Sequence, residues 1–324
     1  MKMAGRTSKI AVLDPGYDHY DYEQDLLSRS GYDLQVYAGT SDDHQEKNNF
    51  AADAVGLFVR WTQIDAAFLS KCPQLKVIIR YGAGYENIDL EAASRANVKV
   101  ANVGGYGNHS VSDHALSLIY ASIRGLFQGT AGFRDQFGRA PFPEIFELHR
   151  KTLGIIGLGR IGGTLARKAG GLFDKLVASD PYIPDARFSD LGVEKVDLEH
   201  LLRQSHVISI HCNLTSETRH LIDSKAFDQM DQRPFLINTA RGPVIETGAL
   251  LQALDKEKVR GAGLDVFDSD LPSEIEPRIL DHPRIIATGH YAWYSENSLD
   301  ELQKRAAQNM VALLRNETIE DSLN

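Results

Sequence analysis

Cysteine is scarce in this 324-residue sequence, which contains only Cys72 and Cys212. Two cysteines cannot build a disulfide framework, and no Cys/His spacing matches a zinc site, so we expect packed thiols, a reducing compartment and no bound metal. No apolar run approaches the about 20 residues that a membrane-spanning helix requires. The polar segment 1–9 lacks the apolar stretch of a signal peptide. These absences predict a cytoplasmic protein without a membrane partner.

Positive charge is also in deficit, because the formal net charge is −9 at pH 7. Such a balance disfavours nonspecific binding to nucleic acid, and no cluster of basic residues marks a phosphate site. Hydrophobic residues make up 43% and charged residues 24% of the chain, which is typical of a globular protein. The length exceeds that of one ordinary core and predicts two domains.

Short apolar runs alternate with helix-length segments along almost the whole chain. This βα rhythm is typical of parallel sheets with helices on both faces. We therefore predict an α/β protein with two doubly wound parallel-sheet domains. The predicted strands are 10–13, 33–37, 54–59, 77–80, 98–102, 153–157, 175–179, 207–211, 235–238, 261–266 and 285–288.

A glycine fingerprint, Gly157-Leu158-Gly159-Arg160-Ile161-Gly162, follows the predicted strand 153–157 and precedes a helix-like stretch. Its glycines allow a tight strand-to-helix turn, close approach of backbone amides to a pyrophosphate, and close packing of helix on strand. Asp180 comes eighteen residues after Gly162, a spacing at which a carboxylate binds the adenosine ribose. Because a carboxylate also repels a 2′-phosphate, we predict NAD rather than NADP.

The fingerprint lies in the middle of the chain, so the units before it need a sheet of their own. A predicted helix from Ser110 to about Arg124, with Asp113 completing a capping box, separates the two halves. A second predicted helix, 295–315, ends the chain and is expected to pack back on the first domain. We predict a discontinuous substrate domain, 1–103 with 290–324, and a nucleotide-binding domain, 104–289.

Three later segments place polar groups at predicted strand ends. Arg241 follows one strand, and its planar guanidinium can bind a carboxylate through two hydrogen bonds. The next strand is followed by a run of carboxylates that includes Asp265 and Asp270, and the last one by His290. Ligands of open α/β sheets bind beyond the carboxyl ends of strands, so these groups are candidates for one site.

These segments, in this order, resemble the D-isomer-specific 2-hydroxyacid dehydrogenase family over essentially the whole chain. The stretches Arg80–Asp89, Asn238–Gly242 and Leu264–Val266 match it together with the fingerprint. The segment Tyr291–Glu296 is most similar to the C-terminal-binding-protein branch, which carries a tryptophan at Trp293. The resemblance implies a Rossmann nucleotide-binding domain, a flavodoxin-like substrate domain, and an active site in the cleft between them.

The catalytic residues implied by the resemblance are Arg241, Asp270 and His290. His290 would act as general acid and base at the carbonyl oxygen while hydride passes between NAD(H) and C2 of a small 2-keto or 2-hydroxy acid. Asp270 stands where the family has a glutamate that binds the imidazole, and its side chain is one methylene shorter. Glu274 and Glu276 are alternatives for that role.

The resemblance also assigns the binding residues. The substrate-binding residues would be Arg80, Gly82, Ala83 and Trp293, of which Arg80 and Trp293 can equally be structural. His109 and His114 are expected to be partly exposed structural histidines. The cofactor-binding residues would be Val111, the six residues 157–162, Asp180, Tyr182, His211, Cys212, Thr218, Thr239, Ala240, Arg241, Asp265 and His290.

Two functions remain open at this point. The first is an NAD-dependent dehydrogenase that forms a homodimer through its nucleotide-binding domain. The second is an NAD(H)-sensing protein that keeps the fold to bind partners, with weak or vestigial dehydrogenase activity. The complete set of arginine, carboxylate and histidine favours the enzyme, whereas the shorter Asp270 favours the sensor.

Overall fold

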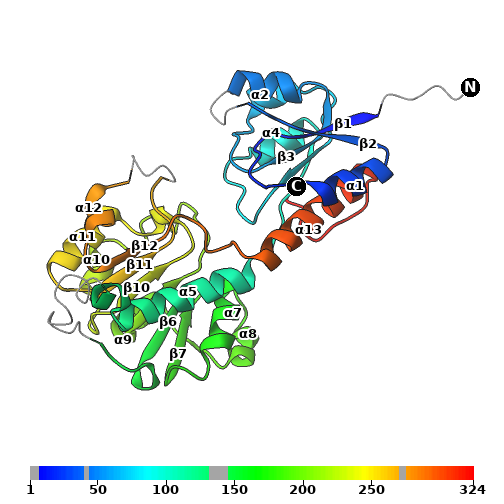
Figure 1. Ribbon diagram of the computed structural model, residues 1–324. Coiled ribbons are helices and arrows are strands. Elements are labelled where there is room, and N and C mark those ends of the chain that lie inside the picture. Colours follow the sequence, from blue (N-terminus) through cyan, green and yellow to red (C-terminus); the bar gives the residue numbers. More distant parts are fainter. Residues whose placement is uncertain (1–6, 40–43, 131–144, 270–274) are drawn as a thin grey trace, which may run out of the picture. The chain divides into compact units, whose positions relative to one another are not determined.

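The computed structural model describes residues 7–39, 44–130, 145–269 and 275–324, and the chain divides into two compact units (Figure 1). The first unit is Met1–Tyr106 with Ser295–Asn324, and the second is Gly107–Tyr294. The segment 290–294 groups with the second unit, whereas the sequence pattern assigned it to the first. The reason is local, because the His290 amide donates to the Asp265 carbonyl at 2.8 Å.

The first unit is built on a five-stranded sheet in which every pairing is parallel. Its strand order, β2-β1-β3-β4-β5, is that of flavodoxin-like folds. β3 is buried along its whole length, as expected for a central strand covered on both faces. The strands are β1 Ser8–Val12, β2 Tyr32–Val36, β3 Ala54–Val59, β4 Val77–Arg80 and β5 Lys99–Ala101.

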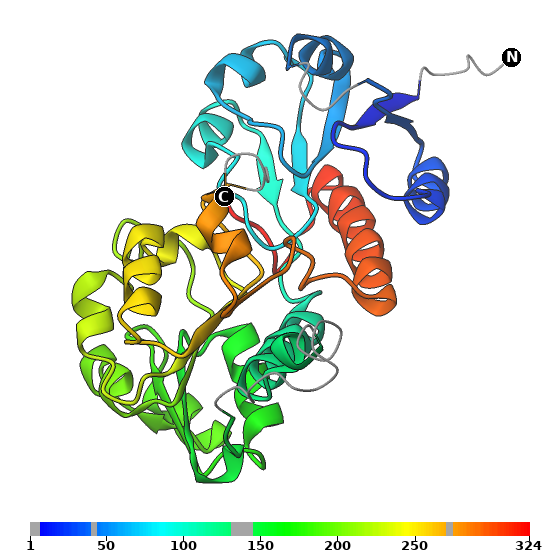
Figure 2. The ribbon, with the colours of Figure 1, turned by 60° about the vertical axis from the view of Figure 1, so that its left-hand side comes forward.

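Helices cover both faces of this sheet. Helix α13 (Glu296–Leu314), from the end of the chain, lies beside α1 (Asp21–Arg29) and against β4, as Figure 2 shows in red and blue. A capping box of Ser295 and Ser298 starts α13. The predicted final helix is therefore confirmed, together with its packing on the first unit. The remaining helices of this unit are α2 His44–Ala51, α3 Ala66–Ser70 and α4 Leu90–Arg95.

The second unit is built on a seven-stranded parallel sheet in the order β12-β11-β10-β9-β6-β7-β8. This is a doubly wound Rossmann order whose direction switches between β6 and β9, where such sheets bind ligands. The prediction of two doubly wound α/β sheets is confirmed. The strands are β6 Thr152–Ile156, β7 Lys175–Ser179, β8 Glu194–Lys195, β9 Val207–Ile210, β10 Phe235–Asn238, β11 Gly261–Leu264 and β12 Ile285–Ala287.

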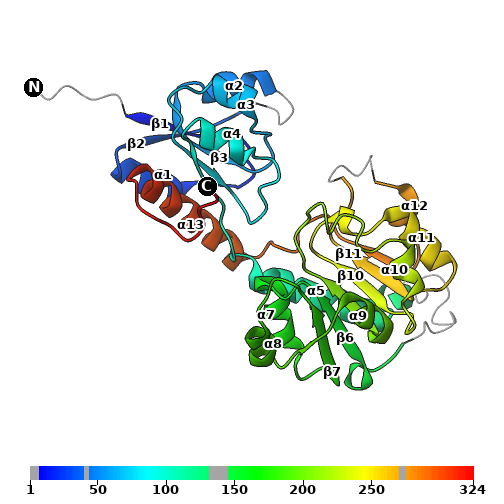
Figure 3. The same cartoon turned by 180° about the vertical axis from the view of Figure 1, so that it is seen from behind.

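Two groups of helices enclose this second sheet (Figure 3). Helix α5 (Asn108–Ile123) packs on α7 (Arg160–Ala169) and on β10 and β11. Helices α9 and α10 pack against each other, and α9 lies on β6 and β7. The remaining helices are α8 Asp185–Leu191, α9 Leu198–Gln204, α10 Ser224–Asp228, α11 Thr247–Asp255 and α12 Pro277–Asp281, with 3₁₀ turns η1 Leu148–Arg150 and η2 Gly242–Val244.

The start of α5 differs from the sequence prediction. Gly107 is the N-cap, and no side chain caps the helix, so Ser110 lies inside the first turn. Asp113 instead accepts a hydrogen bond from Lys168 Nζ at 2.7 Å, and the same ammonium donates to Ser112 Oγ. The predicted capping box is therefore wrong, because Asp113 is used to join α5 to α7. The helix packs through an apolar side, since Val111, Ala115, Leu118 and Ile119 are buried.

No helix within the described ranges is both long enough and apolar enough to cross a membrane.

Candidate active site and cofactor site

The glycine fingerprint forms the turn between β6 and α7. Gly157 has φ +90°, and a Cβ there would lie 2.7 Å from the backbone nitrogen of Cys212. A Cβ on Gly162 would lie 2.1 Å from the Gly157 carbonyl oxygen. Around Gly159, in contrast, a Cβ would meet no atom within 4 Å. The first and third glycines therefore serve tight packing, and the second leaves open space beside the turn.

The start of α7 has the features of a phosphate-binding helix terminus. Its N-cap, Gly159, has no side chain to satisfy the first amides of the helix. These amides and the helix dipole favour an anion at that point. Arg160 is exposed and Ile161 half-buried at the same turn. Leu158 is fully buried and donates its amide to Asp180 Oδ2 at 2.8 Å.

Asp180 lies directly after β7, as the fingerprint requires. Its carboxylate accepts the amides of Leu158 and Tyr182, at 2.8 and 3.0 Å. It thereby ties the fingerprint turn to the segment after β7 and keeps further acceptor directions for a ligand. The Tyr182 hydroxyl donates to Glu217 at 2.6 Å, and this hydrogen bond raises the Tyr182 pKa.

Two buried polar atoms at strand ends of the second unit have no hydrogen-bond partner among the residues that the structure describes. They are Thr239 Oγ1, after β10, and His211 Nδ1, after β9. Nε2 of His211 contacts Ser209 Oγ at 2.8 Å, and burial lowers the pKa of His211 to about 4. Buried polar groups without partners are rare, and their position at the carboxyl edge fits a ligand with hydroxyl or amide groups.

The segment that follows β9 forms a compact turn. The Thr218 hydroxyl donates to the Asn213 carbonyl at 2.6 Å and accepts the Thr215 amide at 2.8 Å. Burial raises the pKa of the Cys212 thiol to about 11, so this cysteine is a packed thiol rather than a reactive thiolate. The sequence predicted packed thiols, and the structure places both cysteines outside any disulfide.

Arg241 follows β10 and caps the short turn η2. The buried Asn238 side chain shapes this turn by donating to the Arg241 carbonyl and accepting the Ala240 amide, at 2.9 and 3.0 Å. The Arg241 guanidinium in turn donates to the Ala240 carbonyl at 2.7 Å. The arginine is therefore held at the carboxyl edge of the sheet, as predicted.

Asp265, directly after β11, holds the turn that carries His290. Its side chain is 1% exposed. Oδ1 accepts the Thr288 hydroxyl at 2.6 Å and the Tyr291 amide at 3.2 Å, and Oδ2 accepts the Ala292 amide at 2.9 Å. Charge-assisted bonds of this kind are about twice as strong as neutral ones. The carboxylate thus holds the residues that precede and follow His290 in the sequence.

His290 itself is exposed and has φ +54°, in the left-handed region. Such a backbone costs energy and persists when surrounding contacts determine it. The Asp265 carbonyl accepts the His290 amide at 2.8 Å, and the His290 carbonyl accepts Trp293 Nε1 at 3.0 Å. Trp293 therefore helps to hold this turn, and its predicted substrate role stays a prediction.

His114, on α5, completes this network and was missed as a site residue. Its Nε2 lies 3.0 Å from Thr288 Oγ1 and 3.5 Å from Asp265 Oδ1, and its ring meets Tyr291 edge-on at 5.1 Å. His109, in contrast, is exposed, as predicted. No sequence pattern links α5, β11 and β12, so only the fold identifies His114 as a neighbour of the turn that carries His290.

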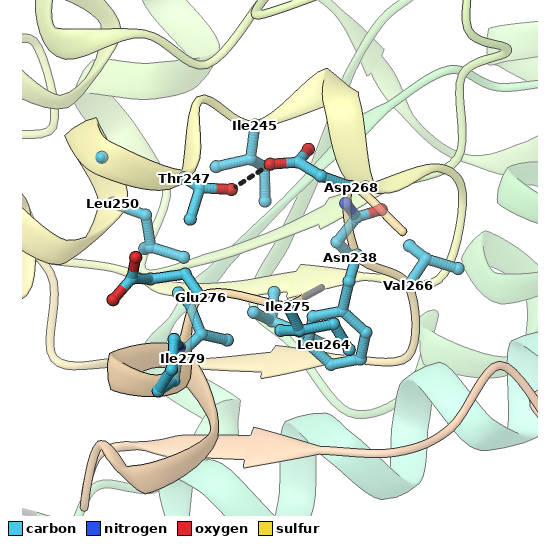
Figure 4. Close-up of a pocket in the computed structure, with 14 residues that line it drawn as sticks. Asn238, Ile245, Thr247, Leu250, Leu264, Val266, Asp268, Ile275, Glu276 and Ile279 are labelled. Atoms are coloured by element: carbon cyan, nitrogen blue, oxygen red, sulfur yellow. Dashed lines mark hydrogen bonds between the residues drawn. The ribbon is translucent and has the colours of Figure 1, made fainter. Parts of the chain in front are cut away.

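Asp270, the carboxylate partner predicted for His290, lies outside the described residues, as does its alternative Glu274. The other alternative, Glu276, caps α12 and lines a cavity of about 490 Å³ between the starts of α11 and α12 (Figure 4). Thr247 and Asp268 are hydrogen-bonded at 2.7 Å in the same cavity. His290 and Arg241 do not line it.

The remaining predicted substrate residues lie in the first unit. Arg80 is the last residue of β4, and its guanidinium donates to the Tyr81 carbonyl at 2.7 Å. Gly82 has φ +124° and is buried, whereas Ala83 is exposed and its carbonyl accepts the Asn102 amide group at 2.6 Å. Their substrate role stays a prediction.

A family model described as D-isomer specific 2-hydroxyacid dehydrogenase, NAD binding domain, matches residues 116–292. The chain belongs to this family. The match lies within the second unit, which is therefore its NAD-binding domain. The resemblance recognised in the sequence is confirmed at family level, while its narrower assignment to the C-terminal-binding-protein branch is not.

Relatives agree with this assignment. The chain is 35% identical to D-3-phosphoglycerate dehydrogenase of Methanocaldococcus jannaschii over 98% of its own length, but spans only 59% of that protein. It is 31% identical to glyoxylate reductase of Korarchaeum cryptofilum, over 78% of this chain and 77% of the relative. The structure of D-lactate dehydrogenase from Aquifex aeolicus with NAD and lactic acid matches with a TM-score of 0.84 and 27% identity, over 96% of both chains.

The residues present fit NAD. Three features lie along the carboxyl edge of the seven-stranded sheet, whose order switches between β6 and β9. They are the open space at Gly159, the uncapped start of α7 and the unpartnered Thr239 hydroxyl. Within the described residues, no group of three or more histidine, cysteine or acidic side chains is arranged to hold a metal ion.

Proposed function

We propose that the protein is an NAD-dependent D-2-hydroxyacid dehydrogenase that reduces small 2-keto acids. The observation that carries this proposal is the network in which Asp265 clamps the turn bearing His290, at the end of the strand next to β10 and Arg241. Carboxyl ends of parallel strands share one edge of a sheet, so Arg241, Asp265 and His290 come from three adjacent strand ends.

In this proposal Arg241 binds the substrate carboxylate and polarises the neighbouring keto oxygen. NADH, when bound, supplies the hydride that reduces C2. His290 donates a proton to the keto oxygen, which becomes the hydroxyl, and accepts it back in the reverse reaction. Asp265 keeps the imidazole in place through the turn. We assign the carboxylate that faces His290 to Asp270, as the family motif implies.

The cofactor assignments from the sequence follow the same edge. The amides of residues 158–161 would bind the pyrophosphate, and Asp180 with Tyr182 the adenosine. Thr239 and Ala240 would bind the far ribose, Val111 would lie at the nicotinamide face, and Asp265 would bind the carboxamide. The groove wall would be formed by His211, Cys212 and Thr218. Arg80, Gly82, Ala83 and Trp293 remain the proposed substrate-binding residues.

A reductase assay tests this function. The purified protein is mixed with NADH and a panel of glyoxylate, pyruvate, hydroxypyruvate, oxaloacetate and 3-phosphohydroxypyruvate, and the loss of NADH absorbance is followed. We expect turnover of at least one acid, and a loss of about 10² to 10⁴ in kcat for His290→Gln. His149→Gln, at an exposed histidine beside Glu147, is the matched control and should keep wild-type turnover.

Binding of NADH, measured by its fluorescence, separates the two functions left open by the sequence. If NADH binds but no acid in the panel is reduced, the dehydrogenase proposal fails. The NAD(H)-sensing, partner-binding function is then favoured. The relatives bearing enzyme names favour the dehydrogenase.

We also propose a homodimer formed through the second unit, and a cytosolic location. Large apolar side chains on α5 and in the segments after it are exposed: Tyr120 at 40%, Leu126 at 56%, Phe127 at 61% and Ile145 at 44%. Exposed apolar side chains of this size are typical of an interface between subunits where they gather on one surface. Phe127→Asp should lower the mass measured by light scattering to that of one chain if Phe127 lies in the interface. The free thiols of Cys72 and Cys212 suit a reducing compartment.

A further inference from the structure

The first unit is assembled from two separate segments of the chain, and one buried carboxylate lies where they meet. This residue, Glu23 on α1, is fully buried. Tyr81, after β4, donates its hydroxyl to Glu23 Oε1 at 2.8 Å. Gln303, on the C-terminal helix α13, places its Nε2 at 3.2 and 3.3 Å from the two carboxylate oxygens. Glu23 therefore joins α1, the end of β4 and α13 in the interior of the unit.

The hydrogen bonds to this carboxylate come from uncharged groups. One hydrogen of the Gln303 amide is donated to the His19 carbonyl at 2.9 Å, so the two oxygens of Glu23 share the other. The Tyr81 hydroxyl and the backbone amide of Glu23 contribute as well. Among the described residues, Glu23 forms no ion pair with a lysine or an arginine. An interior carboxylate without a cation costs free energy, because no opposite charge replaces the water that it loses.

Asp14, a second buried acid of this unit, is compensated by a cation. The Lys47 ammonium donates to its Oδ1 at 2.6 Å, and Thr62 donates its hydroxyl to Oδ1 at 2.5 Å and its amide to Oδ2 at 2.9 Å. Burial alone would raise the pKa of Asp14, but these donors hold it below the ordinary value. At Glu23, in contrast, burial outweighs the hydrogen bonds and raises the pKa above its ordinary value of 4.5.

The charged groups on the elements around Glu23 are engaged elsewhere. They are His19 with Asp21 and Arg29 with Asp25 around α1, Arg80 with the Tyr81 carbonyl after β4, and Lys304 with Asp300 and Arg305 with Glu301 and Asp321 on or beside α13. His19 lowers the Glu23 pKa through its charge, but its side chain is 68% exposed, so water and salt screen the interaction. The neighbouring phenols of Tyr17, Tyr20 and Tyr81 stay neutral, because burial raises their pKa.

We propose that Glu23 is a proton-dependent lock, which holds α13 on the first unit more firmly when its carboxyl is neutral than when it is ionised. A neutral carboxyl still accepts hydrogen bonds from Tyr81 and Gln303, and it leaves no uncompensated charge in the interior. Opening of α13 admits water to Glu23 and so removes the cost of the buried charge. The lock therefore weakens as Glu23 ionises. It lies within the first unit and does not depend on the proposed dehydrogenase function.

Proton linkage gives the direction of the pH dependence. Because its pKa is raised in the folded protein, Glu23 binds its proton more tightly in the closed unit than in the opened one, between pH 4.5 and the raised value. The opening constant of α13 should therefore rise by up to about tenfold per pH unit across this window, and become constant above it. His211 changes the stability of the second unit in the opposite direction, so a measurement local to α13 is required.

Hydrogen exchange of α13 in the full chain, followed by mass spectrometry between about pH 5 and pH 8, provides this measurement. Glu23→Gln keeps the size of the side chain and removes its charge, and comparison at equal pH cancels the intrinsic exchange rates. We expect the ratio of opening constants, wild type over Glu23→Gln, to grow about threefold or more across this range. A ratio that does not change with pH would overturn the proposal. Asp25→Asn, at an exposed carboxylate of the same helix paired with Arg29, is the control and should match wild type.

Carbon-13 NMR of the carboxyl groups in glutamate-labelled protein observes the titration directly, and it needs no change at Glu23. Tyr81→Phe removes the hydroxyl that donates to the carboxylate and little else, so it should raise the Glu23 pKa further and identify its signal. We expect one glutamate to titrate above 4.5 in the wild type, and at a still higher pH in Tyr81→Phe. If no glutamate titrates above 4.5 and responds to Tyr81→Phe in this way, the lock is refuted.

Discussion

Thr288→Val tests the network beneath His290 most directly. The Thr288 hydroxyl donates its one hydrogen to Asp265 Oδ1 at 2.6 Å. Its oxygen lies 3.0 Å from His114 Nε2, so the imidazole must donate to it and carries its proton on Nε2. Valine keeps the branched shape of threonine but removes the donor to Asp265 and the acceptor for His114.

The contacts that Asp265 keeps in the Thr288→Val variant determine how much stability is lost. Asp265 keeps the Tyr291 and Ala292 amides, so its charge stays partly satisfied. Loss of one hydrogen bond to a buried charge costs about 1.5–3 kcal/mol of unfolding free energy. For a unit of this size each kcal/mol lowers Tm by about 2–4 °C, so we expect a drop of about 3–12 °C. Thr288→Ser keeps the hydroxyl and should lose much less.

Calorimetry on the wild type and both variants measures this difference, and NADH oxidation with the best keto acid measures its consequence. We expect the valine variant to lose turnover, since the turn that holds His290 in a left-handed conformation is loosened. Equal Tm values for the serine and valine variants would refute the reasoning, because the hydroxyl would then contribute nothing to the turn.

Two further predictions concern the NAD-binding unit. The His211 pKa of about 4 in the folded protein lies below its ordinary value of 6.5, so the unfolded chain binds more protons between these pH values and stability should fall as pH falls from 6.5 to 4. His211→Leu should flatten the unfolding free energy over that window in denaturant titrations at several pH values, and a slope as steep as that of the wild type would contradict this. Gly162→Ala should weaken NADH binding and cost about 1–3 kcal/mol of stability, because its Cβ meets the Gly157 carbonyl oxygen at 2.1 Å. Gly171→Ala, where a Cβ meets no atom within 4 Å, is the control, and equal effects at the two glycines would argue against the packing role.

The strand pattern was read correctly where strands are buried. β3, β4, β7 and β10 have the predicted bounds, because continuous apolar runs bounded by polar turns leave little choice of register. β8 was missed, since its two residues, Glu194 and Lys195, are exposed and carry no apolar signal. It exists only because β7 offers an edge to pair with.

Local capping signals were less reliable than strand signals. The spacing of Ser110 and Asp113 matched a capping box, but the helix starts earlier and Asp113 contacts Lys168 on α7. A tertiary ion pair thus competes with a local cap for the same carboxylate. The contacts of His114 were missed for a related reason, because its partners Thr288 and Asp265 follow the distant strands β12 and β11, and sequence spacing gives no information on such contacts.

Asp265 shows how a residue found by resemblance can have a second role. The family implies that it binds the carboxamide of the cofactor, and the structure shows three donors already on its carboxylate. A carboxylate has about four acceptor directions, which leaves capacity for a further donor such as the proposed carboxamide N–H. Replacing Asp265 would then disturb both the proposed cofactor contact and the His290 turn. Thr288→Val affects the turn alone, so a selective loss of kcat with unchanged NADH affinity in that variant would separate the two roles.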